Sequence, residues 1–141
     1  MGGTFYCSAA GTFAGDVTAN ASDIRLKTNI RNIDSPLEKI SKINGVYFNW
    51  NDKAKVLADK DTETNQVGIF AQQIKKAFPE IVKAAPFDVE FDDENSLPGK
   101  NKYKSKSGEN YLTIQYEKMV PLLVECIKEL KLEIDELKKN K

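Results

Sequence analysis

The last part of the chain carries a hydrophobic repeat that constrains its fold more than any other feature. The repeat consists of Val120, Leu123, Ile127, Leu130, Ile134 and Leu137, which recur at intervals of three and four residues. This heptad seam has a β-branched residue at each a position and leucine at each d position, which is typical of a coiled coil. From Lys128 onward the flanking residues are almost all charged. A helix with one narrow apolar stripe packs against copies of itself, so we predict an oligomer.

The seam leaves two points about the assembly open. A stripe of this kind can also lie across the chain's own domain instead of against a second copy. Its residue types favour a parallel dimer, but a body domain attached to the helix can override that choice. Pro121 fits only in the first turn, where no intrahelical hydrogen bond is lost, so we expect the helix to begin near Glu117 or Lys118.

Upstream of the seam, the first clear helix signal lies at Ser35. This serine, followed by a proline and three residues later by Glu38, is the sequence of a capping box. Apolar residues then mark one face of the segment, and Gly45 supplies a stop signal. We therefore predict a helix from Pro36 to about Ile43, with the Ser35 side chain as its N-cap.

Further patterns predict the rest of a small mixed body, and we expect an α+β fold. Alternating residues over 46–50 predict a strand that ends with Trp50 pointing inward. A short strand over 67–70 leads into a helix that ends near Pro79, and residues 111–114 resume a strand.

Three other segments differ from this body. Residues 51–65 and 91–110 are polar connections, and the acidic run at 92–95 fits a solvated hairpin tip better than a cation site. The first 21 residues are small and almost uncharged, which favours short β segments with tight turns. We predict that 1–21 is the end of a larger, upstream β-rich body and 22–141 a separate domain, with its coiled-coil helix over about 117–140.

Composition excludes several classes of function. A chain of 141 residues predicts one domain, and its 21 basic and 21 acidic residues argue against nucleic-acid binding. No apolar run is long enough to span a membrane. Histidine is absent, and Cys7 and Cys126 alone cannot form a zinc site, so we expect no metal and no cofactor, and two reduced thiols. Any chemistry must use Ser, Thr, Lys, Asp, Glu or Tyr.

Several sequence blocks, in order, resemble one known family. The blocks are GDVTA at 15–19, SDIRLKTNI at 22–30, VYFNW at 46–50, VGIFAQQI at 67–74, FPEIV at 78–82, YEKMVPLL at 116–123 and IKEL at 127–130. Together they resemble the autoproteolytic intramolecular chaperone domain of phage tailspikes, tail fibres and neck appendages, with endosialidase as the familiar example. The resemblance covers roughly residues 16–132, and the segment 87–110 matches nothing specific in the family.

The resemblance implies an assembly and an activity. Such domains form a homotrimer, help an attached fibre to trimerise, and then cut themselves off before the serine of a Ser-Asp pair with a serine–lysine dyad. Carried onto this chain, Ser22 becomes the nucleophile, Lys27 the general base, and the bond between Ala21 and Ser22 the scissile bond. The implied partners are further copies of the chain and its own upstream fibre segment. The implied location is the host cytoplasm during virion assembly, with the chaperone part absent from the mature virion.

A separation of five residues limits how Ser22 and Lys27 could meet. On a strand they lie about 16 Å apart on opposite faces, and on a helix about 140° apart. The chain must turn tightly between Asp23 and Leu26, or Lys27 must act on a neighbouring subunit. We expect Asp23 to cap such a turn, because pairing with Lys27 would keep the lysine protonated. A base must be neutral, so we also expect Lys27 to be desolvated in the uncut state.

Two other functions remain open at this stage. A trimerisation module that is never cleaved would remain as a permanent C-terminal foot of the fibre, and only self-cleavage separates it from the first reading. An ordinary coiled-coil adaptor of a host cell would form a stable oligomer that does not depend on any upstream β-structure.

Overall fold

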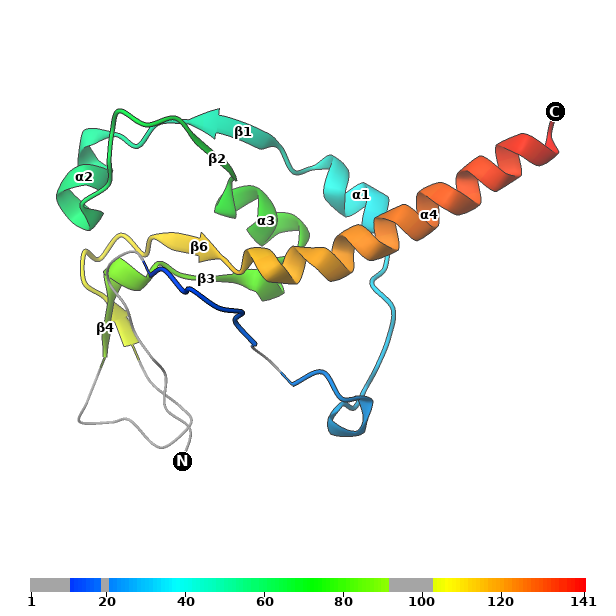
Figure 1. Cartoon of the computed structure of the whole chain (residues 1–141), viewed down its shortest axis with the longest axis horizontal. Coiled ribbons are helices and arrows are strands. Elements are labelled where there is room, and N and C mark those ends of the chain that lie inside the picture. The colour runs from blue at the N-terminus through cyan, green and yellow to red at the C-terminus, as the bar shows by residue number, and fades with distance from the viewer. Residues whose placement is uncertain (1–10, 19–20, 92–102) are drawn as a thin grey trace.

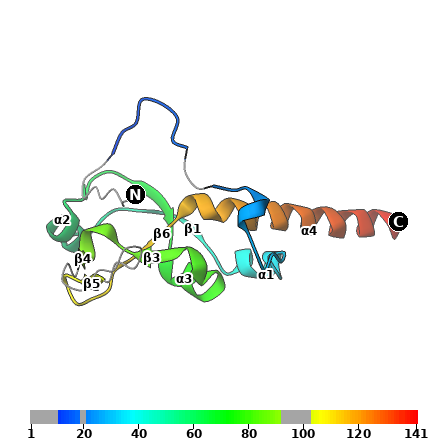
Figure 2. The same cartoon turned by 90° about the horizontal axis from the view of Figure 1, so that it is seen from below.

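Helix α4 (Met119–Lys139) runs from the middle of the molecule to one end, and the other described elements lie beside its N-terminal half or beyond its N-terminal end (Figures 1 and 2). The computed structural model describes residues 11–18, 21–91 and 103–141. The helix follows directly on a 3-10 turn, η4 (Tyr116–Lys118), and holds Pro121 in its first turn. Both features agree with the start predicted from the sequence.

The body is built from short helices and three separate pairs of antiparallel strands. The helices are α1 (Pro36–Ser41), α2 (Asp52–Ala58) and α3 (Ala71–Ala77), with 3-10 turns η1 (Ile24–Leu26), η2 (Pro79–Ile81) and η3 (Pro86–Asp88). The strand pairs are β1 (Gly45–Phe48) with β2 (Gln66–Ile69), β3 (Val82–Ala84) with β6 (Leu112–Ile114), and β4 (Val89–Phe91) with β5 (Tyr103–Ser105). The predicted α+β class is therefore confirmed.

The hydrophobic core lies where α3, η2 and the first half of α4 meet. Its buried members are Ile74, Ile81, Met119, Leu122 and Cys126, and half-buried side chains of α1 and neighbouring segments pack around them. Burial raises the pKa of the Cys126 thiol, and the charge of Glu129 adds to the shift. This cysteine is thus a buried, inert member of the core, while Cys7 lies outside the described residues.

The start of α1 corrects the predicted capping box. Ser35 adopts a left-handed conformation with φ of 45°, and its side chain makes no capping hydrogen bond. The backbone N–H of Leu37 instead donates to Glu129 Oε2 of α4 at 3.1 Å. A carboxylate suits this place because the first N–H groups of a helix lack partners and its N-terminus carries partial positive charge. Glu129, which lies 92 positions after Leu37 in the chain, therefore makes the capping contact predicted for Ser35.

Two other predictions about the body also need correction. The segment 51–65 contains helix α2, whose N-cap Asn51 accepts a hydrogen bond from the Ala54 N–H at 2.9 Å. Its hydrophobic Val56 and Leu57 are exposed. The segment therefore lacks the buried apolar face by which a helix can be predicted from sequence. Trp50 lies beyond the end of β1 and is 36% exposed, whereas the sequence predicted it inside the strand and the core.

The polar segment 105–111, which begins at the end of β5, is held by one buried carboxylate. Asp88 Oδ1 accepts from the Ser107 N–H, and Oδ2 accepts from Ser105 Oγ and the Tyr111 N–H. Burial alone would raise the pKa of Asp88, but these hydrogen bonds together outweigh it and lower the pKa to about 2. The predicted tip at 92–95 lies outside the described residues. So does most of the predicted fibre end at 1–21, of which residues 11–18 form no strand.

The core predicts a clear contrast between two leucines of α4. Leu122 is fully buried, whereas Leu132 is 65% exposed. Leu122→Ala should lower the free energy of unfolding by about 2–5 kcal/mol, because it removes buried apolar surface and leaves a cavity. Leu132→Ala deletes the same atoms from an exposed site and should leave stability nearly unchanged. Thermal and urea unfolding at one fixed protein concentration would measure both; equal losses would contradict the packing described here.

The Asp88 carboxylate predicts a specific dependence of stability on acid. Because folding lowers its pKa from 3.8 to about 2, the stabilisation is complete above the unfolded value and is lost as the pH falls through the folded one. Asp88→Asn should lower the unfolding temperature at neutral pH, since an amide NH2 would face donors, and should remove this part of the acid dependence. Glu90→Gln, which breaks an exposed ion pair with Lys104 in the same strand pair, is the matched control and should change little. An Asp88→Asn protein with the parent's unfolding profile from pH 7 to pH 2 would contradict this role.

Candidate functional site

The segment that carries the predicted dyad folds into a single tight turn. Residues 24–26 form η1, closed by hydrogen bonds from the Leu26 N–H to the Asp23 carbonyl and from the Lys27 N–H to the Ile24 carbonyl, each 3.1 Å. Asp23 lies at the N-cap, and its Oδ1 accepts from the Arg25 N–H at 2.9 Å. Aspartate is among the best residues for this position because its short side chain can accept a hydrogen bond from the N–H two residues later in the chain.

The turn brings Ser22 and Lys27 into contact within one chain. Lys27 Nζ lies 3.0 Å from Ser22 Oγ, a hydrogen-bond distance. Neither a strand nor a regular helix would allow this at a separation of five residues. The geometry required for an amine to exchange a proton with the serine hydroxyl is therefore present in the single chain.

Asp23 and Arg25 form an ion pair beside the dyad. Arg25 Nη2 lies 2.7 Å from Asp23 Oδ2, and Arg25 Nε donates to both carboxylate oxygens at 3.0 and 3.2 Å. The side-chain hydrogen bond from Arg25, with the backbone bond from the same residue, lowers the pKa of Asp23. Sequence reasoning gave Arg25 no role, although it stands between the two dyad residues in the block 22–30.

The dyad faces solvent in the single chain. Ser22, Lys27 and the residues between them are all exposed. Figure 1 shows η1 as the short blue helix that stands apart from α4 and from the strand pairs. Ala21 on the other side of the predicted scissile bond is also exposed, and residues 19–20 lie outside the described part of the chain. No described side chain therefore shields the Lys27 amine from water.

The predicted seam on α4 is exposed along its whole length. All six of its side chains are exposed to solvent: Val120, Leu123, Ile127, Leu130, Ile134 and Leu137. The helix packs against its own body with a neighbouring face that carries Met119, Leu122 and Cys126. At about 100° per residue, the centres of the two faces are about a quarter turn apart. The alternative in which the seam itself packs across its own domain is thus wrong for this chain.

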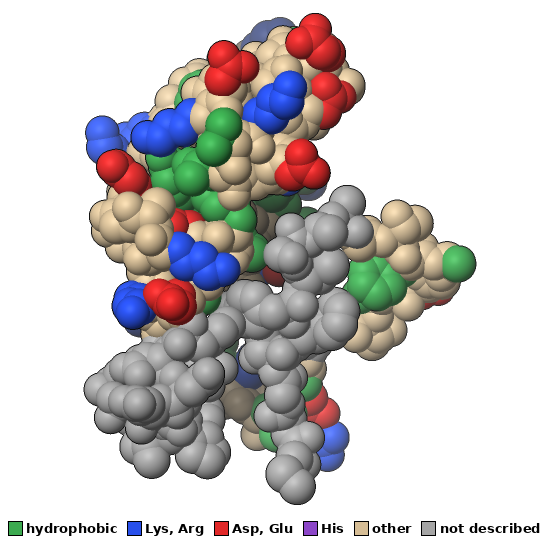
Figure 3. Space-filling view, turned by 90° about the vertical axis from the view of Figure 1, so that its left-hand side faces the viewer, with side chains coloured by type: hydrophobic (Ala, Val, Ile, Leu, Met, Phe, Trp, Pro, Cys, Tyr) green, Lys and Arg blue, Asp and Glu red, His purple; other side chains and the backbone are tan. Residues whose placement is uncertain are grey.

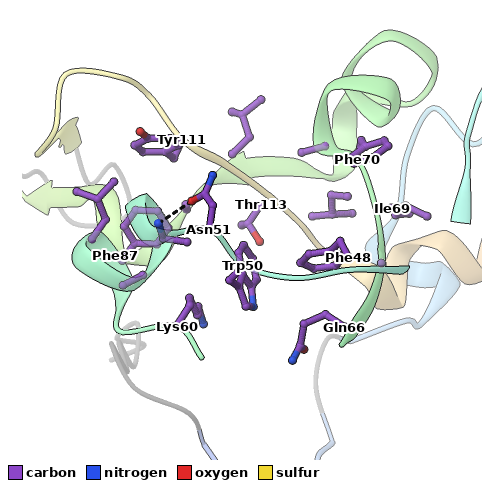
Figure 4. A pocket seen from close by; sticks show the side chains of 18 of the residues that line it. Phe48, Trp50, Asn51, Lys60, Gln66, Ile69, Phe70, Phe87, Tyr111 and Thr113 are labelled. Atoms are coloured by element: carbon purple, nitrogen blue, oxygen red, sulfur yellow. Dashed lines mark hydrogen bonds between the residues drawn. The ribbon is translucent and has the colours of Figure 1, made fainter. Parts of the chain in front are cut away.

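A second feature of the surface is an apolar cleft of about 780 Å³. It lies between β1, β2 and α2 on one side and β6 and η3 on the other, with aromatic side chains along it (Figure 4). The rings of Phe48 and Trp50 meet edge to face with centroids 5.0 Å apart, and Lys60 Nζ lies 5.6 Å from the centre of the Trp50 ring. Figure 3 shows hydrophobic side chains gathered on this end of the molecule among scattered acidic and basic groups. The described lining residues include no carboxylate and no thiol, and the ionisable groups among them are lysines and tyrosines.

The described part of the chain holds neither a group of metal ligands nor a membrane-spanning helix. Its His, Cys, Asp and Glu side chains form no group that could hold a metal ion. None of its helices is both long enough and apolar enough to cross a bilayer.

Comparison with known proteins finds one matching family and a group of similar phage proteins. Residues 22–83 match the sequence model of a family that is named as a peptidase and described as "Chaperone of endosialidase". Long tail fiber protein Gp37 of Enterobacteria phage K3 is 33% identical over 116 residues, which are 82% of this chain and 8% of that protein. Gp37 of Enterobacteria phage Ox2 is 32% identical over 137 residues, 96% of this chain and 45% of that protein.

The matches define what part of a longer protein the chain resembles. It spans 8% and 45% of the lengths of these two relatives, so it corresponds to less than half of either. The family match begins at Ser22, directly after the segment that the sequence assigned to a fibre. The resemblance inferred from the sequence blocks is thereby confirmed over residues 22–83, which match the chaperone-of-endosialidase family.

Proposed function

We propose that this chain is the chaperone part of a phage tail fibre, which drives trimerisation of the attached fibre and then releases itself by one cut between Ala21 and Ser22. The observation that carries the cut is the contact of 3.0 Å between Lys27 Nζ and Ser22 Oγ. The chaperone description of the family and the similarity to the tail fibre protein Gp37 support the role in fibre assembly. The peptidase name of the family supports the cleavage.

The position of Ser22 after the scissile bond determines the chemistry. A neutral Lys27 amine takes the proton from Ser22 Oγ, which attacks the carbonyl carbon of Ala21 through a five-membered ring. The peptide nitrogen of Ser22 leaves with a proton returned by Lys27, so that an ester joins the Ala21 acyl group to Ser22 Oγ. Water then hydrolyses the ester, giving a carboxylate at Ala21 and a free amine at Ser22. Because the nucleophile leaves with the released part, each chain cuts once.

The exposed seam supports assembly through α4. Seven hydrophobic side chains are buried and 21 large ones are exposed among the described residues. The whole seam falls in the second group, and copies of α4 packed along it would remove this apolar surface from water. The homotrimer of the family is the assembly we propose, with one upstream fibre strand contributed by each chain.

Assembly would also control the timing of cleavage. A lysine acts as a base only when neutral, and burial favours the neutral amine. Since Ser22 and Lys27 are exposed in the single chain, the shielding must come from neighbouring subunits or from the attached fibre. A chain outside the assembly would then stay uncut, and the chaperone would leave only a correctly assembled fibre. We place these steps in the host cytoplasm during virion assembly, so that the released part is absent from the mature virion.

Intact mass spectrometry of the purified chain with its upstream fibre segment tests the cut. The parent should give a fragment that begins at Ser22. Ser22→Ala should abolish this fragment, and Lys27→Arg should slow its formation by about 10²- to 10⁴-fold, because an arginine keeps the charge but cannot accept a proton. An uncut parent would leave the permanent trimeric foot as the function of this chain.

Mixing two inactive chains distinguishes the routes to the cut. The dyad contact lies within one chain, so a mixture of Ser22→Ala and Lys27→Ala chains, refolded together, should remain uncut. Recovery of the Ser22 fragment in the mixture would show that a lysine acts on the serine of a neighbouring subunit.

The seam predicts a sharp difference between two residues with the same exposure. Ile127 lies in the seam and Leu132 outside it, and they are 67% and 65% exposed in the single chain. Ile127→Lys should break the assembly, because every copy would bring a charge to the same buried layer. Leu132→Lys should leave it intact. Sedimentation velocity would measure the mass of the assembly formed by each variant. A parent that sediments as a monomer, or two variants of equal mass, would refute assembly through the seam.

A further inference from the structure

We propose that Arg25 is a positioning residue for the Ser22–Lys27 pair, because it holds the carboxylate of Asp23 away from the Lys27 amine. This inference rests on the proposed self-cleavage, and the contacts that carry it are all within the turn formed by residues 22–27.

Arg25 occupies both oxygens of the Asp23 carboxylate. Its Nε donates to Oδ1 and Oδ2, its Nη2 donates to Oδ2, and its backbone N–H donates to Oδ1. The planar guanidinium fits a carboxylate with two parallel hydrogen bonds, an arrangement that a lysine ammonium cannot match. Both carboxylate oxygens of Asp23 therefore already accept hydrogen bonds from Arg25, and the turn carries a second cation.

The other cation of the turn is the Lys27 ammonium, which contacts the residue that precedes Asp23. Lys27 Nζ is 3.0 Å from the side chain of Ser22, the immediate neighbour of Asp23 in the chain. A lysine has a flexible stem of four carbons, so its ammonium can turn from Ser22 to a carboxylate at Asp23 that Arg25 no longer holds. Such a pair would stabilise the protonated lysine and take it from Ser22 Oγ, and both effects oppose its action as a base.

The charges around the turn leave Asp23 as the acid that matters. No ionisable side chain from another described element forms an ion pair or hydrogen bond with Lys27. The next acid along the chain, Asp34, is held by Lys39 at 3.1 Å. With Arg25 in place, the Asp23–Arg25 pair is neutral as a unit; without it, a bare carboxylate stands beside the serine.

A merely structural role for Arg25 predicts a different behaviour. The backbone N–H of Arg25 donates the hydrogen bond that Asp23 Oδ1 accepts as N-cap. Any residue other than proline at position 25 supplies that N–H. Asparagine caps helices about as well as aspartate, so Asp23→Asn keeps the cap while removing the charge. The two substitutions together therefore separate the charge of Asp23 from the shape of the turn.

The experiment compares the pH profile of self-cleavage in the parent, Arg25→Ala, Asp23→Asn and the double variant. Arg25→Ala should cleave about tenfold more slowly at neutral pH, with its profile displaced about one unit to higher pH, as expected for an amine beside a new negative charge. Asp23→Asn, which keeps the cap and lacks the charge, sets the reference rate for a turn without the carboxylate. The double variant should recover the rate of Asp23→Asn, because the carboxylate that traps the lysine is gone.

A second measurement does not depend on cleavage. In a Ser22→Ala background, the ¹³Cε resonance of Lys27 followed by NMR should titrate at higher pH when Arg25 is replaced by alanine. When Asp23→Asn is added, the resonance should titrate again at the lower pH seen with Arg25 in place. An Arg25→Ala chain with the parent's pH profile and lysine titration would overturn the proposal, and so would a double variant as slow as Arg25→Ala. If the parent does not cleave, the proposed function fails, and the lysine titration alone decides the role of Arg25.

Discussion

The packing of α4 against its own body through one face is the interaction on which the other features depend. Met119, Leu122 and Cys126 pack with Ile74 of α3 and Ile81 of η2, and this fixes the rotation of the helix about its axis. The heptad seam lies about a quarter turn away and therefore points outward. The same helix thus completes the core of one chain and offers a hydrophobic stripe to others. Because both faces belong to one rigid element, formation of the core and formation of the seam are coupled.

The body-facing stripe changes character as it leaves the core. After Cys126 the next residue on this face is Glu129, whose carboxylate accepts from the Leu37 N–H at the start of α1. A charged group is favourable here because it meets the unpaired N–H groups and the partial positive charge of a helix N-terminus. Beyond this point α4 leaves the body and projects alone (Figure 2). The contact with Glu129 therefore marks where the helix stops packing against its own chain.

The dyad depends on much less of the structure than the core does. Ser22, Asp23, Arg25 and Lys27 lie within six residues, and every contact among them is closed by one turn. The turn stands apart from the core, and the contact between Ser22 and Lys27 is present in the single chain (Figure 1). In the proposed mechanism, what the single chain lacks is the exclusion of water from the lysine. That mechanism takes the local geometry from one chain and the electrostatic environment from its neighbours, so that the proposed cut waits for the fibre.

Features built from near neighbours could be read from the sequence. The heptad spacing predicted α4 and the place of Pro121, the strand and helix signals over 67–77 matched β2 and α3, and the turn between Asp23 and Leu26 is present as η1. Each of these is determined by hydrogen bonds and side-chain spacing within a few residues. The sequence alone could not say that Glu129 replaces Ser35 as the cap of α1, that Asp88 collects three donors, or that the seam faces outward. Those features join segments far apart in the chain, and only the tertiary structure decides which of them meet, because burial and long-range hydrogen bonds exist only after the core has closed.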